Sequence, residues 1–167
     1  MPTTIHLADY DPAWTERFDC EAGGIRRVLQ DRALRVEHVG STSVPGLPAK
    51  PVIDILLEVA DSAREHDYAP LLATLGYRIY IREPEWFGHR LLKPPGNDVN
   101  LHVFSTGCPE IGRMLEFRNW LRANIHDRER YANHKKALAR HEWQSVDDYA
   151  NAKTAVITEI LNRMRTG

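Results

Sequence analysis

Residues 38–59, HVGSTSVPGLPAKPVIDILLEV, contain the most unusual part of the sequence, a loop rich in Gly, Ser and Pro followed by an apolar run. The second half of this stretch, VIDILLEV (52–59), is a nearly continuous apolar run that follows a proline and is too short for a typical helix. Such a run is typical of a buried central strand. In the first half, Gly40 ends a short strand predicted over 33–39 and opens a tight loop. The stretch therefore predicts two strands joined by a loop, with Asp54 and Glu58 interrupting the second strand.

The flanking segments alternate helical and extended patterns. Asp11-Pro12 suits a helix start, because aspartate caps an N-terminus and proline fits the first helical position. Farther along the chain, turn residues separate short apolar runs. We therefore predict, in chain order, a helix over 12–31, strands over 33–39 and 52–59, a helix over 68–75, a strand over 77–81 and a hairpin of strands 89–93 and 99–104.

The chain after Cys108 is helical in pattern. Apolar residues recur at helical spacing, and Ser145 with Asp148 resembles a capping box. We predict helices over 109–123, 127–140 and 145–164. The predicted fold class is α+β, with a mixed sheet of about five strands, an N-terminal helix and a C-terminal layer of about three helices packed on the sheet.

The composition is that of one globular domain. The chain has 167 residues, is 43% hydrophobic and 27% charged, and carries a net charge of −1. A chain of this size buries about 70% of its unfolded surface, so we expect one domain over 1–167, with an α/β core over 1–107 and a helical part over 108–167. The balanced charge gives no strong signal for nucleic-acid binding.

The two isolated cysteines and the lack of a long uncharged apolar stretch indicate the cellular compartment. Cys20 and Cys108 lie far apart without metal-ligand spacing, so neither a disulfide framework nor a zinc finger is predicted. The sequence shows no secretion signal and no stretch of 18 uncharged apolar residues. We therefore expect a cytoplasmic protein with no membrane partner, and the oligomeric state stays open.

The loop and the second strand together suggest a phosphate site. A Gly-Ser turn such as Gly40-Ser41 presents free backbone N–H groups and a hydroxyl, which suit a phosphate, although a tight turn without a ligand is the alternative. Asp54, on the strand beside this turn, is suited to hold a divalent cation that bridges the phosphate. A buried aspartate needs such a partner, because burial of an unpaired charge is costly.

Residues 38–59 resemble the signature of the GrpB family, which is assigned to the polymerase-β-like nucleotidyltransferase superfamily. The resemblance extends through FGHRLLK (87–93), NLHVF (100–104), EFRNWLR (116–122), and the pairs Tyr131 with Lys135 and Tyr149 with Lys153. It implies a nucleotidyltransferase-like fold and the transfer of a nucleoside monophosphate from an NTP to an unknown acceptor. It also implies Mg²⁺ or Mn²⁺ as cofactor, and a nucleotide or other phosphorylated small molecule as partner.

The resemblance and the residue types together imply three sets of site residues. The catalytic set is Asp54, Lys50 and Arg90, and the metal set is Asp54, Glu58 and His102. The nucleotide- or phosphate-binding set is Gly40, Ser41, Thr42, Ser43, His38, Lys93, Arg118, Arg122 and Lys135. Ordinary structural roles are the alternative for several of them: Arg90 and Lys93 also suit the solvated face of an edge strand, and His38 and His102 also suit buried structural positions.

The sequence departs from the superfamily pattern at one position. That pattern has a second carboxylate two residues after the first, where this chain has Leu56. Asp54 and Glu58 point to one face of the strand but lie about 13 Å apart, too far to bind one Mg²⁺ directly. Asn100 or His102 is the candidate for the third position of the pattern. This departure favours, as the alternative to the transferase, a catalytically degenerate module that binds a nucleotide or phosphate in a regulatory role.

Two further interpretations are weaker. A metal hydrolase built from His38, His89, His102 and Asp54 lacks helical HExxH-type spacing. Trp86 stands in a loop that is suited to the mouth of a pocket, although a core or rim position is the simpler role.

Overall fold

A five-stranded sheet lies at the centre of the computed structural model, which describes residues 6–139 and 146–166. The strand order is β1-β2-β5-β4-β3. Only β2 and β5 run parallel to each other, and the other neighbouring strands are antiparallel. The strands are β1 (Arg35–Val39), β2 (Ile53–Val59), β3 (Arg78–Glu83), β4 (His89–Lys93) and β5 (Val99–Ser105). The predicted mixed sheet and its hairpin are confirmed, and β3 extends two residues beyond its predicted end.

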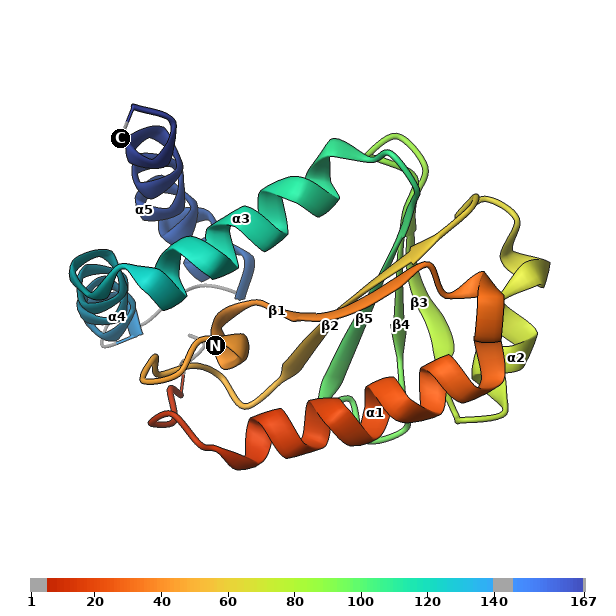
Figure 1. The fold of residues 1–167 in the computed structure, drawn as a ribbon. Coiled ribbons are helices and arrows are strands. Elements are labelled where there is room, and N and C mark those ends of the chain that lie inside the picture. Colours follow the sequence, from red (N-terminus) through yellow and green to blue (C-terminus); the bar gives the residue numbers. More distant parts are fainter. Residues whose placement is uncertain (1–5, 140–145, 167) are drawn as a thin grey trace.

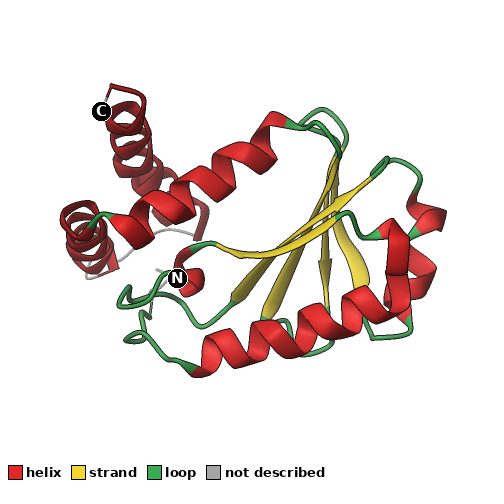
Figure 2. Ribbon diagram, in the orientation of Figure 1, coloured by secondary structure: helices red, strands yellow, loops and turns green. Residues whose placement is uncertain are grey.

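The first face of the sheet packs against α1 (Ala13–Leu29) and the short α2 (Ala69–Ala73), which lie together on one side in Figures 1 and 2. Side chains alternate along β2, so Ile55 and Leu57 point to this face and form the main core with Ile25 and Leu72. The chain continues after α1 as a 3₁₀ turn, η1 (Gln30–Arg32), and a second such turn, η3 (Glu65–Asp67), precedes α2. Both helices are therefore slightly shorter than predicted.

The second face of the sheet is covered by α3 (Pro109–Ala123), which runs along it in Figure 1. Leu56 of β2 points to this face and is fully buried against Phe104, Ile111 and Leu115. Asp54 shares the face, because it stands two residues before Leu56 on the same strand. Asp54, near the start of β2, therefore lies beside this apolar cluster and is not part of it.

The last two helices, α4 (Ile125–Ala139) and α5 (Val146–Thr166), pack against the loop between β1 and β2. Val44 and Leu47 of this loop are buried against Tyr131 and Ile160. The prediction that all three C-terminal helices lie on the sheet is therefore correct for α3 only, because the apolar loop provides a separate core beyond the end of the strands. The predicted capping box at Ser145 and the predicted helix end at Arg140 lie outside the described residues.

Within residues 6–139 and 146–166, no helix is long and apolar enough to cross a membrane. Cys20 and Cys108 are both free thiols. The division of the chain into a core over 1–107 and a helical part over 108–167 stays a prediction.

Candidate functional site

Gly40 and Asp54 define the centre of the candidate site. Gly40 has a φ of +74°, in the left-handed region that favours glycine. A Cβ at this position would lie 2.5 Å from Asp54 Oδ2, far inside van der Waals contact. Glycine is therefore required for two reasons, its backbone conformation and the close approach of the loop to the carboxylate. The 3₁₀ turn η2 (Ser41–Ser43) follows directly.

His38 holds the loop from the α1 side of the sheet. Its Nε2 lies 2.9 Å from Thr42 Oγ1, and Thr42 donates its hydroxyl proton to Val52 O at 3.3 Å. The imidazole stacks on Phe18 with ring centroids 4.9 Å apart, and burial lowers the pKa of His38 to about 4. A neutral imidazole with Nε2–H as the donor to Thr42 satisfies every one of these contacts. His38 and Thr42 thus position the loop, and His38 lines neither of the two cavities beside it.

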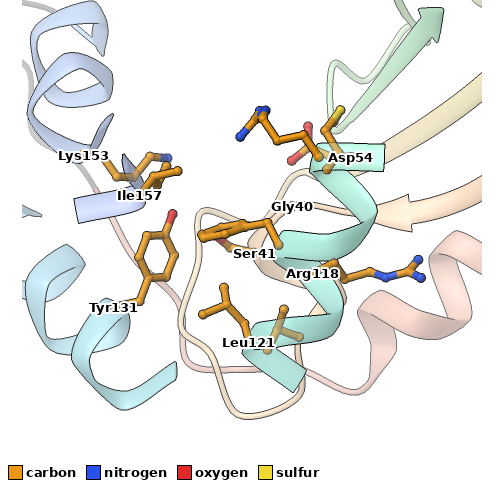
Figure 3. Close-up of a pocket in the computed structure, with 12 residues that line it drawn as sticks. Gly40, Ser41, Asp54, Arg118, Leu121, Tyr131, Lys153 and Ile157 are labelled. Atoms are coloured by element: carbon orange, nitrogen blue, oxygen red, sulfur yellow. The ribbon is translucent and has the colours of Figure 1, made fainter. Parts of the chain in front are cut away.

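Two arginines of α3 hold the loop from the opposite side. Arg118 donates to His38 O at 2.9 Å and pairs with Glu37 at 2.8 Å, and Arg122 donates to Ser43 O at 2.9 Å. In Figure 3 the Arg118 side chain points away from the space between α3 and α5. The predicted phosphate ligands Ser43, Arg118 and Arg122 are therefore used in fixing the backbone of the loop.

Asp54 lies in a hydrogen-bonded group on the α3 face of the sheet. Its Oδ1 accepts from Asn100 Nδ2 at 3.2 Å and pairs with His102 Nε2 at 3.1 Å. His102 Nδ1 lies 3.0 Å from His89 Nε2, and His89 Nδ1 lies 2.8 Å from Glu83 Oε1. Because β5 lies next to β2 in the sheet, Asn100 is in register with Asp54. The predicted closeness of Asp54 to Asn100 and His102 is found in the structure.

The side chains around Asp54 do not form the predicted metal site. Glu58 lies at the other end of β2, where it pairs with Arg35 at 3.2 Å and accepts from Thr106 at 2.8 Å. His102 uses both ring nitrogens in hydrogen bonds, one to Asp54 and one to His89. Asn100 Oδ1 has no partner among the described residues, but a neutral amide does not replace a carboxylate in charge.

Leu56 fills the position of the second carboxylate with a buried apolar side chain. In the described part of the chain, no group of three His, Cys, Asp or Glu side chains is arranged to hold a metal ion. The predicted set Asp54, Glu58 and His102 is therefore not brought together. The same holds for the hydrolase interpretation, because His38 lies on the opposite face of the sheet from His102.

Lysines from three segments surround a polar cavity of about 220 Å³ beside the loop. Lys50 belongs to the loop, Lys135 to α4 and Lys153 to α5, and all three line the cavity with Ser41 and Asp54. Thr42 and Asn100 also line it. The cavity is thus lined by one carboxylate and three lysine side chains.

Lys135 is the most unusual of the three lysines. Its side chain is buried, with 2% of the residue exposed, and its Nζ donates to Ser41 Oγ at 2.8 Å and to Pro48 O at 3.0 Å. Both partners are neutral oxygens. Burial, followed by the charges of Lys153 and Lys50, lowers the pKa of Lys135 to about 7. Burial and the charge of Lys50 also lower the pKa of Lys153.

A second cavity, of about 200 Å³, shares Ser41, Asp54 and Lys153 with the first. Figure 3 shows Asp54 and Lys153 on opposite sides of this space, with Tyr131 and Ile157 between the helices. Its other walls come from the loop and α3. They include the apolar Val44, Met114, Phe117 and Leu121, together with Arg113 and Arg118. A polar and an apolar compartment therefore meet at Ser41 and Asp54.

The basic residues of β4 do not reach either cavity. Arg90 is in register with Val103, so it points to the α1 face, where it pairs with Glu65 at 3.0 Å. The Lys93 ammonium lies 4.4 Å from the centre of the Tyr80 ring on β3. Arg90, predicted in the catalytic set, and Lys93, predicted in the phosphate-binding set, therefore do not line the cavities beside Asp54. The strand register directs Arg90 to the other face of the sheet, and Lys93 lies over the Tyr80 ring.

Lys153 lines both cavities but is not among the predicted site residues. The sequence feature that drew attention to Lys153 was Tyr149, four residues earlier. The Tyr149 side chain lies outside the described part of the chain. The contact between His89 and His102 had no signal, since the register of a hairpin is not visible in its sequence. Trp86, proposed at a pocket mouth, instead packs edge-on against the His89 ring at 5.1 Å.

Comparison with solved structures defines the class of fold. The Cid1 poly(U) polymerase with Mg 3′-dATP bound superposes with a TM-score of 0.57 at 10% identity, over 79% of this chain and 44% of that chain. The fold is therefore that of the nucleotidyltransferases, as residues 38–59 predicted, and at this identity the likeness concerns the fold alone.

Closer relatives define the family. A model of the GrpB family, described as GrpB protein, matches residues 4–163. A UPF0157 protein of Halalkalibacterium halodurans is 59% identical over 96% of this chain and 82% of its own length. The crystal structure of the conserved protein GrpB from Enterococcus faecalis superposes with a TM-score of 0.77 at 33% identity, over 93% of this chain and 99% of that chain. The chain belongs to the GrpB family.

Proposed function

We propose that the protein binds a phosphorylated small molecule, such as a nucleotide, and neutralises the phosphate charge with lysines instead of a metal ion. The observation that carries this proposal is Lys135, a buried ammonium group whose two hydrogen-bond partners are neutral oxygens. A buried cation without a carboxylate partner is unfavourable, and a bound anion would remove that cost. Lys50 and Lys153 line the same cavity and add to its positive charge.

The geometry of the loop supports the same proposal. Ser41 stands between the two cavities, and its hydroxyl is already oriented by the Lys135 ammonium. A phosphate in the polar cavity would meet Ser41, Lys135 and Lys153 together, each able to donate a hydrogen bond. The organic part of the ligand would then enter the neighbouring compartment, where Phe117 and Tyr131 provide aromatic walls.

The transfer of a nucleoside monophosphate from an NTP to an acceptor is the second candidate function. The observation that favours it is the close approach of Gly40 to Asp54 in a fold shared with a nucleotide-binding polymerase. A transferase of this kind depends on carboxylates that hold metal ions. The buried Leu56 and the distant Glu58 leave Asp54 as the one carboxylate that lines the cavity among the described residues, so binding is the better-supported function.

Thermal unfolding with tripolyphosphate in EDTA tests the proposal. A ligand at 100 times its Kd adds about 2.7 kcal/mol of apparent stability, so we expect a clear rise in Tm for the native chain. Lys135→Met removes the buried ammonium and should abolish the rise. Lys136→Met is the matched control, since Lys136 is the exposed neighbour on the same helix, and it should leave the rise intact. Equal rises in both variants would refute the role of Lys135.

The same assay separates the two candidate functions. If ATP raises the Tm in EDTA as well as in Mg²⁺, the lysine site accounts for binding. If ATP raises the Tm only in the presence of Mg²⁺ or Mn²⁺, the transferase becomes the better-supported function.

A further inference from the structure

Ser41 and Lys135 form a close pair at the wall of the polar cavity. Lys135 Nζ lies 2.8 Å from Ser41 Oγ and 3.0 Å from Pro48 O. A nucleophilic hydroxyl and its general base need a separation of about 2.6–3.2 Å, and a third group usually orients the base. The Pro48 carbonyl holds the amine from a second direction. The three groups thus have the arrangement of a nucleophile, a base and a group that orients the base.

The contacts of Lys135 suit a neutral amine as well as an ammonium group. A neutral amine has two N–H groups and one lone pair. Ser41 then donates its hydroxyl proton to Lys135 Nζ, while Nζ still donates to Pro48 O. Both of these partners are neutral oxygens, so neither contact is an ion pair that would hold the proton on Nζ. Lys135 is therefore able to take the proton of the Ser41 hydroxyl.

The groups that face Lys135 act on its proton in both directions. Burial has the largest effect, and the charges of Lys153 on α5 and Lys50 in the loop also lower the pKa of Lys135, to about 7. The charge of Asp54 on β2 opposes them, and the Tyr131 ring on α4 lies 5.3 Å from Nζ, where it favours the ammonium form. A general base is most effective when its pKa lies near the working pH. These surroundings suit Lys135 to that role.

Ser41 is better placed than its neighbour Thr42 to react with a ligand. In the part of the chain that the structure describes, Ser41 has the one hydroxyl that lines both cavities. Thr42 lines the polar cavity only, and its hydroxyl lies 2.9 Å from His38 Nε2 and donates to Val52 O. Ser41 is half-buried, so its oxygen is accessible from the cavities.

We propose that Ser41 is a nucleophile, that Lys135 is its general base, and that the pair takes a phosphoryl group from a phosphoanhydride such as a nucleoside triphosphate. The proposal rests on the proposed function, because the phosphoanhydride must first bind in the cavity. It goes further than binding, since the ligand is cleaved and the protein is modified.

The transfer is one displacement at phosphorus. Ser41 Oγ attacks the terminal phosphorus, and an Oγ–P bond forms. The bond from that phosphorus to the bridging oxygen breaks, and its electron pair leaves with the nucleoside diphosphate. The hydroxyl proton of Ser41 passes to Lys135 Nζ. The products are a phosphorylated Ser41, an ammonium group on Lys135 and the nucleoside diphosphate.

The charges of the cavity favour these products. The transfer creates an ammonium group on Lys135 beside a new phosphate group on Ser41, so a contact between neutral groups becomes an ion pair. Charge-assisted hydrogen bonds of this kind are about twice as strong as neutral ones. Lys50 and Lys153 line the same cavity and would meet the charge on the phosphoryl oxygens during the transfer.

Mass spectrometry of the native chain incubated with ATP in EDTA tests the transfer. We expect one phosphoryl group per chain, located on Ser41 by peptide mapping, and an equal amount of ADP. Ser41→Ala should abolish both. Phosphate on Thr42 in place of Ser41 would overturn the proposal.

Thermal unfolding of the same samples separates this proposal from the proposed function. A rise in Tm with ATP but no phosphate on Ser41 would overturn the transfer and leave binding in place. The absence of both the rise in Tm and the phosphate would overturn binding and transfer together.

Lys135→Arg tests the role of the base. The guanidinium group keeps the positive charge but does not release a proton near neutral pH. We expect the rise in Tm with ATP to persist and the rate of transfer to fall by about 100-fold or more, the effect of losing a general base. Lys136→Arg is the matched control, since Lys136 is the exposed neighbour on α4, and it should transfer at the native rate. Equal rates in the two variants would overturn the role of Lys135.

The pH dependence of the native chain tests the same role without any substitution. Only the neutral amine takes the proton, so the rate of transfer at saturating ATP should rise between about pH 6.5 and 8.5, by at most tenfold per unit. The phosphates of ATP are largely ionised in this range, because the second ionisation of a phosphate monoester lies near pH 6. A rate that does not change with pH would overturn the assignment of Lys135 as the base.

Discussion

The ammonium group of Lys135 lies 2.8 Å from Ser41 Oγ, although the two residues are 94 positions apart in the chain. This contact joins α4 to the loop that approaches Asp54, and the same ammonium also donates to Pro48 O. Residues from the C-terminal helices and from the loop therefore form one site. The buried Lys135 therefore holds this loop from the side of the C-terminal helices.

Lys135 should make the stability of the protein depend on pH. Its pKa is lowered from 10.5 to about 7, so between these values the unfolded chain binds more protons than the folded one. Stability should therefore rise with pH through this window, and the cost of the buried charge is fully present below it. We expect the native chain to gain stability relative to Lys135→Met by up to about 1.4 kcal/mol per pH unit above about pH 7.

Urea unfolding of both proteins at several pH values between about 6 and 9.5 measures this difference. If the free energy of unfolding changed with pH by the same amount in the two proteins across that range, Lys135 would keep its ordinary pKa in the folded state.

The affinity for a phosphate ligand should fall as the pH rises, whereas the stability of the free protein should rise. A phosphate anion binds the protonated form of Lys135, so the affinity for ATP in EDTA should fall as the pH rises above about 7, by at most tenfold per unit. The phosphates of ATP are already ionised there, since the second ionisation of a phosphate monoester lies near pH 6. Calorimetric titration between about pH 7.5 and pH 9 measures the slope. An affinity independent of pH would mean that the anion does not contact Lys135.

Gly40→Ala should damage both the fold and the site. The new Cβ would stand 2.5 Å from Asp54 Oδ2, on a backbone with a φ of +74°. We expect a loss of about 1–3 kcal/mol in the free energy of unfolding, the range for a residue held in an unfavourable backbone region. Gly23→Ala is the control, because a Cβ there meets nothing within 4 Å and α1 should become more stable by about 0.5–1 kcal/mol. Equal stability of Gly40→Ala and the native chain would contradict the close approach.

Replacement of the basic residues of β4 should leave ligand binding intact. Lys93→Ala removes an ammonium that lies over Tyr80, and Arg90→Met removes the ion pair with Glu65 on the other face of the sheet. We expect the rise in Tm caused by tripolyphosphate to be unchanged in both variants. Arg90→Met alone should lower the Tm of the free protein, since it leaves Glu65 with Arg82 as its remaining arginine partner. Loss of the tripolyphosphate effect in either variant would place β4 in the site after all.

Much of the fold was visible in the sequence for simple physical reasons. The length and apolar character of the run over 52–59 favoured a buried strand, and turn residues marked the hairpin over 89–104. The closeness of Gly40, Ser41 and Asp54 was expected because Asp54 was placed on the strand beside the Gly-Ser turn, and the structure pairs Val39 with Asp54. Lys135 was named from the resemblance, and its burial was not foreseen, since helix α4 gives little periodic signal of its own.

The parts of the site that were missed depend on strand order and register. Placing β5 between β2 and β4 brings His102 within reach of both Asp54 and His89, and nothing in the local sequence states that order. The same register turns Arg90 to the α1 face. Side-chain alternation within one strand could be derived for Asp54 and Leu56, but alternation across a hairpin requires the pairing itself.

The central claim is that protein cations, and not a metal ion, neutralise a phosphorylated ligand at this site. The most direct measurement is calorimetric titration of ATP into the native chain in EDTA and, separately, in excess Mg²⁺. We expect binding in EDTA, with an affinity equal to or higher than that in Mg²⁺, because Mg²⁺ neutralises charge on ATP that Lys50, Lys135 and Lys153 would otherwise meet. Binding that appears only in the presence of Mg²⁺ would contradict the claim and assign the site to metal-dependent transfer.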